Sequence, residues 1–215
     1  MPIPLNNIDN DYNSFNSDQL KICATTKIFP RRSMILSEGE ISNFVYVILS
    51  GSVKVFIRGK SGNELILGIH GVGDFLGELN LFDDSHALTS SMTLVKTKVL
   101  QISKEDIRTQ ASQDTVFACH LLKRASNQIR TLTERLGDFA LTDVYDRVTK
   151  VLINSATPID NHLVIDNPLS QQNMAGIVGA SQAMVSKIFK ELSVGGYINI
   201  DTNKITINKR LPKSW

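Results

Sequence analysis

The stretch 169–207 constrains the fold of this chain more than any other part of the sequence. Ser170 precedes a first short helical pattern, and serine is a favoured N-cap because its hydroxyl accepts a hydrogen bond from a backbone N–H of the first turn. Gly179 then supplies a turn, and a second helix begins after Ser181 and covers 182–194. Two short helices joined in this way and followed by strands are typical of a winged helix-turn-helix.

The second helix has one apolar stripe and ends at two glycines. The stripe recurs at the spacing of one buried helix face and consists of Val185, Ile188 and Leu192. Gly195 and Gly196 predict the end of the helix, because glycine adopts the left-handed conformation that other residues resist. The segments 197–200 and 204–207 then predict a hairpin, the wing of the motif.

The opposite face of the second helix is polar. In this motif the helix lies in the major groove with its N-terminal residues at the base edges. Gln182 can pair bidentately with adenine, and Lys187 can donate to guanine acceptors. Residues at the two helix starts are suited to phosphate contacts, although the alternative is that these side chains only solvate a surface helix. The predicted DNA-binding residues are Gln171, Gln172, Ser181, Gln182, Ala183, Ser186, Lys187 and Lys190.

The positive charge of the chain is concentrated at its C-terminal end. The whole sequence has 23 Lys and Arg against 21 Asp and Glu, a net charge of +2. The segment 168–215 has six cationic side chains against two acidic ones, so that it carries +4 and the remainder −2. This distribution indicates a nucleic acid or another acidic surface as the partner.

The region 22–102 is strand-like and punctuated by turns. The run 44–49 is apolar and rich in β-formers, and the next segment alternates, with Val53, Val55 and Ile57 on one face. Turns recur about every 8–12 residues and no helical crossover separates the strands, which favours an antiparallel barrel or sandwich over a mixed α/β sheet.

The periodicity then changes to that of a long helix over 104–140. This segment has no proline, and its only glycine is Gly137. A heptad seam through it predicts a two-stranded coiled coil and therefore a homodimer, and the alternative is one long helix packed on its own barrel. The predicted dimer interface is Ala118, Leu122, Ala125, Ile129, Leu132, Leu136 and Phe139.

Several functional classes are disfavoured by what the sequence lacks. Cys23 and Cys119 cannot form a disulfide framework or a four-thiolate iron–sulfur cluster within one chain. The N-terminus has no secretory pattern, and no stretch approaches the roughly 18 apolar residues of a membrane span. The four scattered histidines include no His-x-His, which argues against a metal-dependent barrel enzyme. We therefore expect a cytoplasmic protein without membrane contact, which is not an enzyme and has no metal, catalytic residue or resident cofactor.

Four segments occur in the order and spacing of a known family, between about Phe29 and Lys209: FVYVILSGSVKVFI, GDFLGELNLF, LGDFALTDVYDRV and IVGASQAMVSKIFKELSVGGYI. In these segments the chain resembles the Crp–Fnr family of bacterial transcription regulators. The resemblance implies an α+β fold with an N-terminal jelly-roll β-domain, a long dimerisation helix and a C-terminal winged helix-turn-helix. It also implies homodimers that act on palindromic double-stranded promoter DNA and contact RNA polymerase.

The resemblance also implies a division of the chain. The expected parts are a loose N-terminal segment at 1–18, a cyclic nucleotide-binding-like β-domain at 19–103, a dimerisation helix at 104–140, and a winged helix-turn-helix DNA-binding domain at 141–215.

The family's nucleotide cassette is only half present. Its Gly-Glu-Leu occurs at 77–79, where Glu78 would accept from a ribose hydroxyl, but the arginine that neutralises the cyclic phosphate is replaced by Leu88. A buried phosphate without a cation is costly, so we do not expect gating by cyclic AMP in the usual way. The implied effector pocket is Gly77, Glu78, Leu79, Leu88, Thr89, Ser90, Leu132 and Thr133.

Other signals remain open alternatives. A cyclic nucleotide or cyclic dinucleotide could still control DNA binding as an unidentified effector, and a purely nucleotide-binding subunit is disfavoured by the winged helix. Haem would need axial ligands, for which the candidates are His70, His86 and His120, and the oxygen-sensing branch needs an N-terminal cysteine cluster of which only Cys23 is present.

The second helix also departs from the family pattern. Family members commonly carry Arg-Glu and a following Arg, where this chain has Gln182, Ala183 and Lys187. The preferred half-site is therefore expected to differ from the family's commonest one, with Gln182 favouring an A·T pair.

Overall fold

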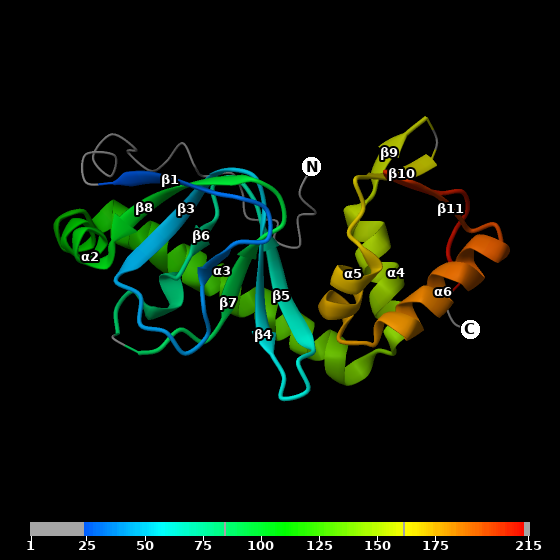
Figure 1. Cartoon of the computed structure of the whole chain (residues 1–215), viewed down its shortest axis with the longest axis horizontal. Helices are drawn as coiled ribbons and strands as arrows, with labels where there is room; N and C mark the ends of the chain where they lie inside the picture. The colour runs from blue at the N-terminus through cyan, green and yellow to red at the C-terminus, as the bar shows by residue number, and fades with distance from the viewer. Residues whose placement is uncertain (1–23, 84, 161, 213–215) are drawn as a thin grey trace.

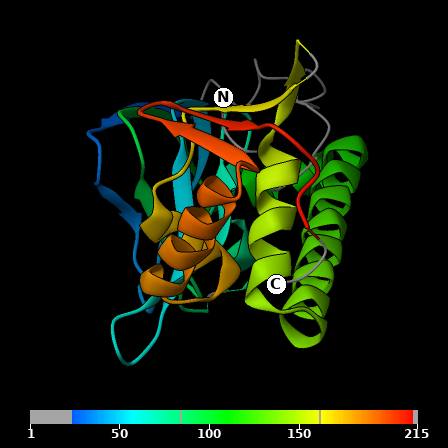
Figure 2. The ribbon, with the colours of Figure 1, turned by 90° about the vertical axis from the view of Figure 1, so that its right-hand side faces the viewer.

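The computed structural model describes residues 24–83, 85–160 and 162–212 (Figure 1). The segment 1–18, predicted to be loose, and Cys23 lie outside these residues. An N-terminal β-domain and a C-terminal unit of helices and strands lie side by side, and the long helix α3 (Thr115–Leu141) runs from the first toward the second (Figure 1, Figure 2).

The β-domain consists of two four-stranded antiparallel sheets. One sheet has the order β1-β8-β3-β6 and the other β2-β7-β4-β5, which is the layout of a jelly roll. The fold class predicted from the sequence is therefore confirmed. The elements are β1 (Thr25–Phe29), β2 (Met34–Leu36), β3 (Phe44–Ser50), β4 (Val53–Arg58), β5 (Glu64–His70), β6 (Phe75–Leu76), the 3-10 helix η2 (Glu78–Asn80), β7 (Ser90–Thr93) and β8 (Thr97–Ser103).

Strand β4 is covered on both faces. Its register against β5 shifts between Val55 and Phe56 because Leu67 of β5 is an extra residue there, whereas its register against β7 is regular. Val53, Val55 and Ile57 therefore lie on one face of β4, as predicted, with Val53 buried and the other two half-buried. Phe56 is 0% exposed on the opposite face, which the sequence did not predict to be covered.

The single helix predicted over 104–140 is two helices, α2 (Lys104–Gln113) and α3. Asp114 separates them with an extended backbone (φ −125, ψ 102), and its carboxylate accepts hydrogen bonds from the backbone N–H groups of Val116 (2.9 Å) and Phe117 (3.1 Å). An aspartate in this position satisfies N–H groups that would otherwise lack a partner at a helix start. Asp114 is visible in the sequence, but the apolar periodicity continues on both sides of it and therefore predicts a single helix.

The C-terminal unit has the predicted winged helix-turn-helix layout. The predicted strand at 162–165, the two short helices and the wing are all confirmed, and the sheet has the order β11-β12-β10-β9. Strand β9 was not predicted. The elements are α4 (Val144–Ser155), β9 (Thr157–Ile159), β10 (His162–Asp166), α5 (Gln171–Val178), α6 (Gln182–Val194), β11 (Ile198–Asp201) and β12 (Lys204–Ile207).

One cluster of buried apolar side chains extends across the boundary between the β-domain and the C-terminal unit. Phe56 of β4 and Ile66 of β5 belong to the same cluster as Met174 and Ile177 of α5 and Val185 of α6. The C-terminal unit is therefore packed on the β4–β5 side of the β-domain rather than joined to it only through α3.

Candidate nucleic-acid interface and effector cavity

Helix α6 is positioned by its N-cap and by its apolar stripe. The hydroxyl of Ser181 accepts a hydrogen bond from the backbone N–H of Met184 (3.2 Å), and the preceding helix ends at Gly179 with a left-handed backbone (φ 62). The predicted stripe is buried, and Phe189 is buried beside it. Of the two glycines predicted to end α6, Gly196 has a positive φ of 68 and Gly195 does not.

The opposite face of α6 is open to solvent. Gln182, Ala183, Lys187 and Lys190 are all exposed, and so is Ser181 at the helix start. Lys187 Nζ lies 3.9 Å from the carboxylate of Glu191 one turn later. An exposed pair of this kind is weak, so it leaves the lysine available to an anion.

Two of the predicted DNA-binding residues are engaged with each other. Ser186 is half-buried, and its hydroxyl donates to the side-chain oxygen of Gln171 on α5 at 2.5 Å. This bond fixes α5 against α6, whereas Gln172 on the first turn of α5 is exposed. The sequence reading missed Met184, which is 45% exposed on the same open side of α6.

A small cavity lies between the β-domain and α3. It has a volume of about 70 Å³, well below the roughly 300 Å³ of typical small-molecule pockets. Its apolar wall comes from both sheets and from α3, and its polar wall includes His70, Glu78, Thr89, Ser91 and Gln128.

Five of the eight predicted pocket residues line this cavity, namely Gly77, Glu78, Leu79, Thr89 and Leu132. Leu88 is not among them; its side chain is 66% exposed and lines the groove beside the β4–β5 hairpin. Ser90 accepts a hydrogen bond from the backbone N–H of Glu38, and Thr133 donates to the carbonyl of Ile129. Three further polar residues line the cavity. Ser91 and Gln128 were not predicted from the sequence, and His70 was named only as a possible haem ligand, because nothing local in the sequence indicates which polar residues the fold places at this cavity.

Gly77 shapes the loop that holds Glu78 at the cavity. Its backbone is left-handed (φ 85), and a Cβ there would lie 3.1 Å from Leu36 Cδ1 and 3.3 Å from the carbonyl oxygen of Phe44. Both the conformation and the space therefore favour glycine.

The cavity is poor in positive charge. Among the lining residues that the structure describes there is no lysine or arginine. Burial raises the pKa of the Glu78 carboxyl and lowers the pKa of His70, so both groups are shifted toward their neutral forms. His70 Nδ1 and Ser91 Oγ are buried without a hydrogen-bond partner among the described residues. Such a cavity offers hydrogen bonds but does not compensate a phosphate.

Two arginines of α3, Arg124 and Arg135, lie beside the cavity without lining it. The Arg124 guanidinium lies 3.8 Å from Asp74 Oδ1 and 4.5 Å from the centre of the Phe75 ring. Arg135 donates to the carbonyl oxygens of Ile66 and Leu67. Both arginines have partners outside the lining, so neither replaces the missing family arginine where Thr89 faces the cavity.

The outward side of α3 is apolar. Leu122, Ile129 and Leu136 are each at least 66% exposed, and Leu132 is 40% exposed. Ala118 is half-buried and Ala125 exposed. The seam residues Leu122, Ile129 and Leu136 thus face away from the β-domain, whereas Leu132 also lines the cavity between the β-domain and α3.

Phe139, the last residue of the predicted seam, has a different contact. Its ring lies against the turn after α5, where a Cβ on Gly179 would approach Phe139 Cε1 to 2.6 Å. The guanidinium of Arg147 stacks over the same ring at 5.1 Å, and its Nε donates to the carbonyl of Val178 at 2.9 Å. Phe139 therefore connects α3 to the C-terminal unit.

No group of three or more His, Cys, Asp and Glu residues in the described part of the chain could hold a metal ion. None of the helices within residues 24–83, 85–160 and 162–212 is long and apolar enough to cross a bilayer.

Comparison with known proteins matches both halves of the chain. A family model of the cyclic nucleotide-binding domain matches residues 26–114, and one of the Crp-like helix-turn-helix domain matches residues 146–210. The chain is 29% identical over 184 residues to the CRP-like cAMP-activated global transcriptional regulator of Mycobacterium tuberculosis, covering 84% of this chain and 82% of that protein. It is 28% identical over 190 residues to the cAMP-activated global transcriptional regulator Vfr of Pseudomonas aeruginosa, covering 85% and 89%.

The fold is shared with solved structures as well. The c-di-GMP-responsive global regulator CLP of Xanthomonas campestris superimposes with a TM-score of 0.79 at 21% identity, covering 90% of this chain and 98% of that one. The relatives named here are transcription regulators rather than enzymes.

Proposed function

The chain belongs to the Crp–Fnr family and is a Crp-like DNA-binding transcription regulator with a cyclic nucleotide-binding domain, and we propose that it acts as a homodimer on palindromic promoter sites. The observation that carries this proposal is α6, whose apolar stripe is buried and whose polar face is open. We assign adenine recognition to Gln182 and guanine recognition to Lys187, both near the start of the helix that enters the major groove.

The remaining predicted contacts position the protein on the duplex. Gln172 and Ser181 are exposed at the starts of α5 and α6, where free backbone N–H groups attract phosphate. Ala183 and Lys190 lie on the open face of α6. Gln171 and Ser186 act together, because their mutual hydrogen bond holds the two helices in register.

The exposed seam of α3 supports the homodimer. Leu122, Ile129 and Leu136 form an apolar row that a second copy would cover, and two α6 helices would then lie about 34 Å apart, one turn of DNA. The division proposed for the chain is 19–103, 104–140 and 141–215, with the break at Asp114 inside the second part.

We further propose that cyclic AMP does not gate this protein in the usual way. Leu88 stands where the family has its phosphate-binding arginine, and the cavity lining contains no cation among the described residues. The protein would then work in the cytoplasm without a resident cofactor, and contact with RNA polymerase follows from the family resemblance.

A second candidate is a sensor whose cyclic nucleotide or cyclic dinucleotide controls DNA binding. The retained loop at Gly77 and Glu78 favours it. The names of the relatives point the same way, because two are cAMP-activated and one is c-di-GMP-responsive.

The test is selection of duplexes from a random-sequence pool by the full-length protein, followed by sedimentation of the free and bound protein. We expect palindromic sites, a dimer mass, and loss of both with Ile129→Asp on the seam. Ile153→Asp is the matched control, because Ile153 is also exposed but lies on α4. A monomer that selects no sequence would contradict the proposal.

A further inference from the structure

The second helix of the C-terminal unit is oriented by a contact between the two halves of the chain. Helix α5, which precedes α6, packs on strand β5, and the two elements contribute to one buried cluster. Figure 2 shows the β4–β5 hairpin on the same side of the molecule as α5 and α6. The orientation of α6 therefore depends on how α5 sits on β5.

The centre of this contact is Ile66 against Gly176, which we call the docking contact. Ile66 is 1% exposed, and a Cβ added to Gly176 would lie 2.9 Å from Ile66 Cδ1 and 3.2 Å from the carbonyl oxygen of Glu64. These distances are too short for ordinary packing. The helix can approach the strand this closely only because residue 176 has no side chain.

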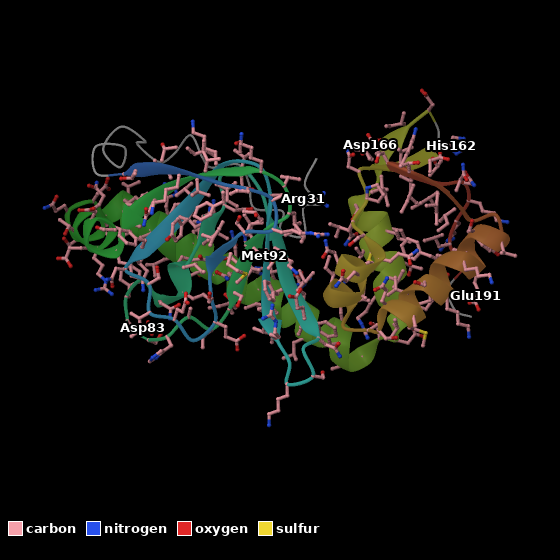
Figure 3. All side chains as sticks on the ribbon, viewed as in Figure 1. Arg31, Asp83, Met92, His162, Asp166 and Glu191 are labelled. Atoms are coloured by element: carbon pink, nitrogen blue, oxygen red, sulfur yellow. The ribbon has the colours of Figure 1, made fainter. Side chains whose placement is uncertain are left out.

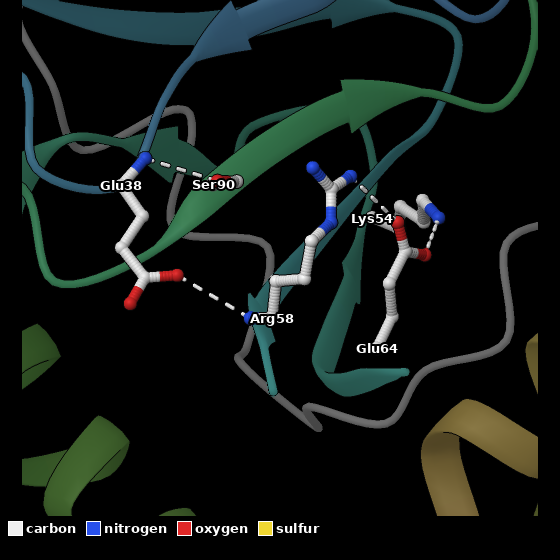
Figure 4. A network of polar contacts seen from close by, with 5 residues as sticks. All are labelled: Glu38, Lys54, Arg58, Glu64 and Ser90. Carbon is white, nitrogen blue, oxygen red and sulfur yellow. Dashed lines mark hydrogen bonds and ion pairs between the residues drawn. The ribbon is translucent and has the colours of Figure 1, made fainter. Parts of the chain in front are cut away.

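The strand side of the docking contact is rigid. The carboxylate of Glu64 bonds to Lys54 across the hairpin and to Arg58 Nη2 at 3.1 Å (Figure 4). The backbone N–H of Arg58 also donates to Glu38 at 3.3 Å. Because these bonds join β5 to β4 and to the loop after β2, the strand cannot easily move aside for a larger residue at 176.

Helix α3 holds both partners of the docking contact. Arg135 Nη1 donates to the carbonyl oxygens of Ile66 (3.2 Å) and Leu67. Phe139, one turn later, lies under Gly179 at the end of α5. The helix that carries the exposed seam is thus connected to β5 and α5 together.

The docked arrangement leaves the predicted DNA-reading residues accessible. Gln182 and Ser181 line the groove of about 950 Å³ between α6 and the hairpin, and both are exposed, as is Lys187. Docking on the β-domain therefore orients α6 without covering it.

We propose that Gly176 and Ile66 are positioning residues for DNA binding, which hold α6 in its reading orientation without a bound effector. The inference rests on the proposed function, because it assumes that α6 reads DNA. It explains how the chain keeps an active arrangement although its cavity does not compensate a phosphate. A regulator that needs no effector must already adopt the docked state in the free protein.

The experiment compares two glycine-to-alanine variants of the full-length protein. Gly176→Ala introduces the methyl group that the docking contact excludes, whereas Gly137→Ala on α3 is the matched control, because a Cβ there has nothing within 4 Å. Alanine favours a helix over glycine, so neither change weakens its own helix. We expect Gly176→Ala to bind a selected duplex about tenfold more weakly than the wild type, because a docked state that falls to about a tenth of the population lowers the apparent affinity by the same factor. Gly137→Ala should bind like the wild type.

Two readouts separate positioning from damage to the fold. Amide hydrogen exchange should rise in β5 and α5 of Gly176→Ala and stay unchanged in β1 and β8. Ile66→Ala in the Gly176→Ala background removes both side-chain atoms that the new methyl group meets, and should recover part of the DNA affinity relative to the matched single variants.

Other outcomes would overturn the inference. Unchanged or tighter DNA binding by Gly176→Ala means that docking does not position α6 or that it inhibits reading. Faster exchange throughout the chain means that residue 176 supports global stability instead. Failure of the wild type to bind any selected duplex contradicts the proposed function itself, and the exchange data then still decide whether the docking contact exists.

Discussion

The polar face of α6 and the cavity beside Glu78 differ in what the replacement of family residues does to their ability to bind an anion. On α6 the family's Arg-Glu pair is replaced by Gln182 and Ala183, and the face remains exposed and flanked by Lys187 and Lys190. At the cavity the described lining contains no cation, and Leu88, which stands where the family has its arginine, is exposed outside the lining. An exposed surface can exchange side chains and keep its affinity for phosphate, whereas a buried anion site depends on each charge.

The two regions are nevertheless connected through strand β5. Leu67 lines the cavity, and its neighbour Ile66 points to the other side of the strand, where it meets Gly176 of α5. Successive side chains of a strand point to opposite faces. A ligand in the cavity would therefore act on α6 through the strand that carries the docking contact.

Restoring the missing cation should produce the largest change. We expect cyclic AMP, cyclic GMP and cyclic di-GMP to leave the melting temperature of the wild type unchanged. Thr89→Arg, which introduces a cation at a residue that lines the cavity, should gain cyclic AMP binding, and at 100 times its dissociation constant the ligand should stabilise the variant by about 2.7 kcal/mol. Differential scanning fluorimetry measures the effect, and Thr89→Gln is the uncharged control. A shift of the wild type with cyclic AMP would contradict our reading of the cavity.

The next effect concerns Lys187. If Lys187 donates to guanine, Lys187→Ala should weaken binding to the selected site by about 1–3 kcal/mol and flatten the preference at one position. Fluorescence anisotropy on duplexes that differ at each position measures both quantities. A uniform loss on all sequences would instead assign Lys187 to a phosphate.

A smaller effect is expected at Gln182. Its amide offers two hydrogen bonds to adenine, so Gln182→Ala should cost about 1 kcal/mol on the preferred site and less on a site in which that A·T pair is replaced. Sequence selection with both proteins tests this. Recovery of the family's guanine-rich half-site, unaffected by the substitution, would show that Gln182 is not a reading residue.

The last effect is on the pH dependence of stability and belongs to the cavity. Burial first, and then Arg124 and Arg135, lower the pKa of His70, while Asp74 opposes them. As the pH falls below about 6.5, His70 is therefore protonated in the unfolded chain before it is protonated in the folded chain. The contribution of neutral His70 to stability is thus present above that pH and is lost below it. His70→Asn should make the loss of stability on acidification shallower by at most about 1.4 kcal/mol per pH unit, measured by urea unfolding between pH 7.5 and 5.5. An identical slope in the two proteins would mean that folding does not lower the pKa of His70.

The winged helix-turn-helix could be predicted nearly residue by residue because its signals are local. Ser170, Ser181 and Gly179 act within one turn of their own helices, and the stripe from Val185 to Leu192 needs only helical periodicity. The seam of α3 and the strand-rich N-terminal region follow from periodicity in the same way.

The sequence by itself therefore determined the succession of β-domain, long helix and winged helix-turn-helix, the open face of α6 and the absence of an arginine near Leu88. The tertiary structure decided what depends on residues far apart in the chain: the burial of Phe56 against the C-terminal unit, the lining of the cavity by His70, and the approach of Gly176 to Ile66. Periodicity describes which side of an element is apolar, but it contains no information on which other element covers that side. The docking of α5 on β5 is such a choice, and only the folded chain makes it.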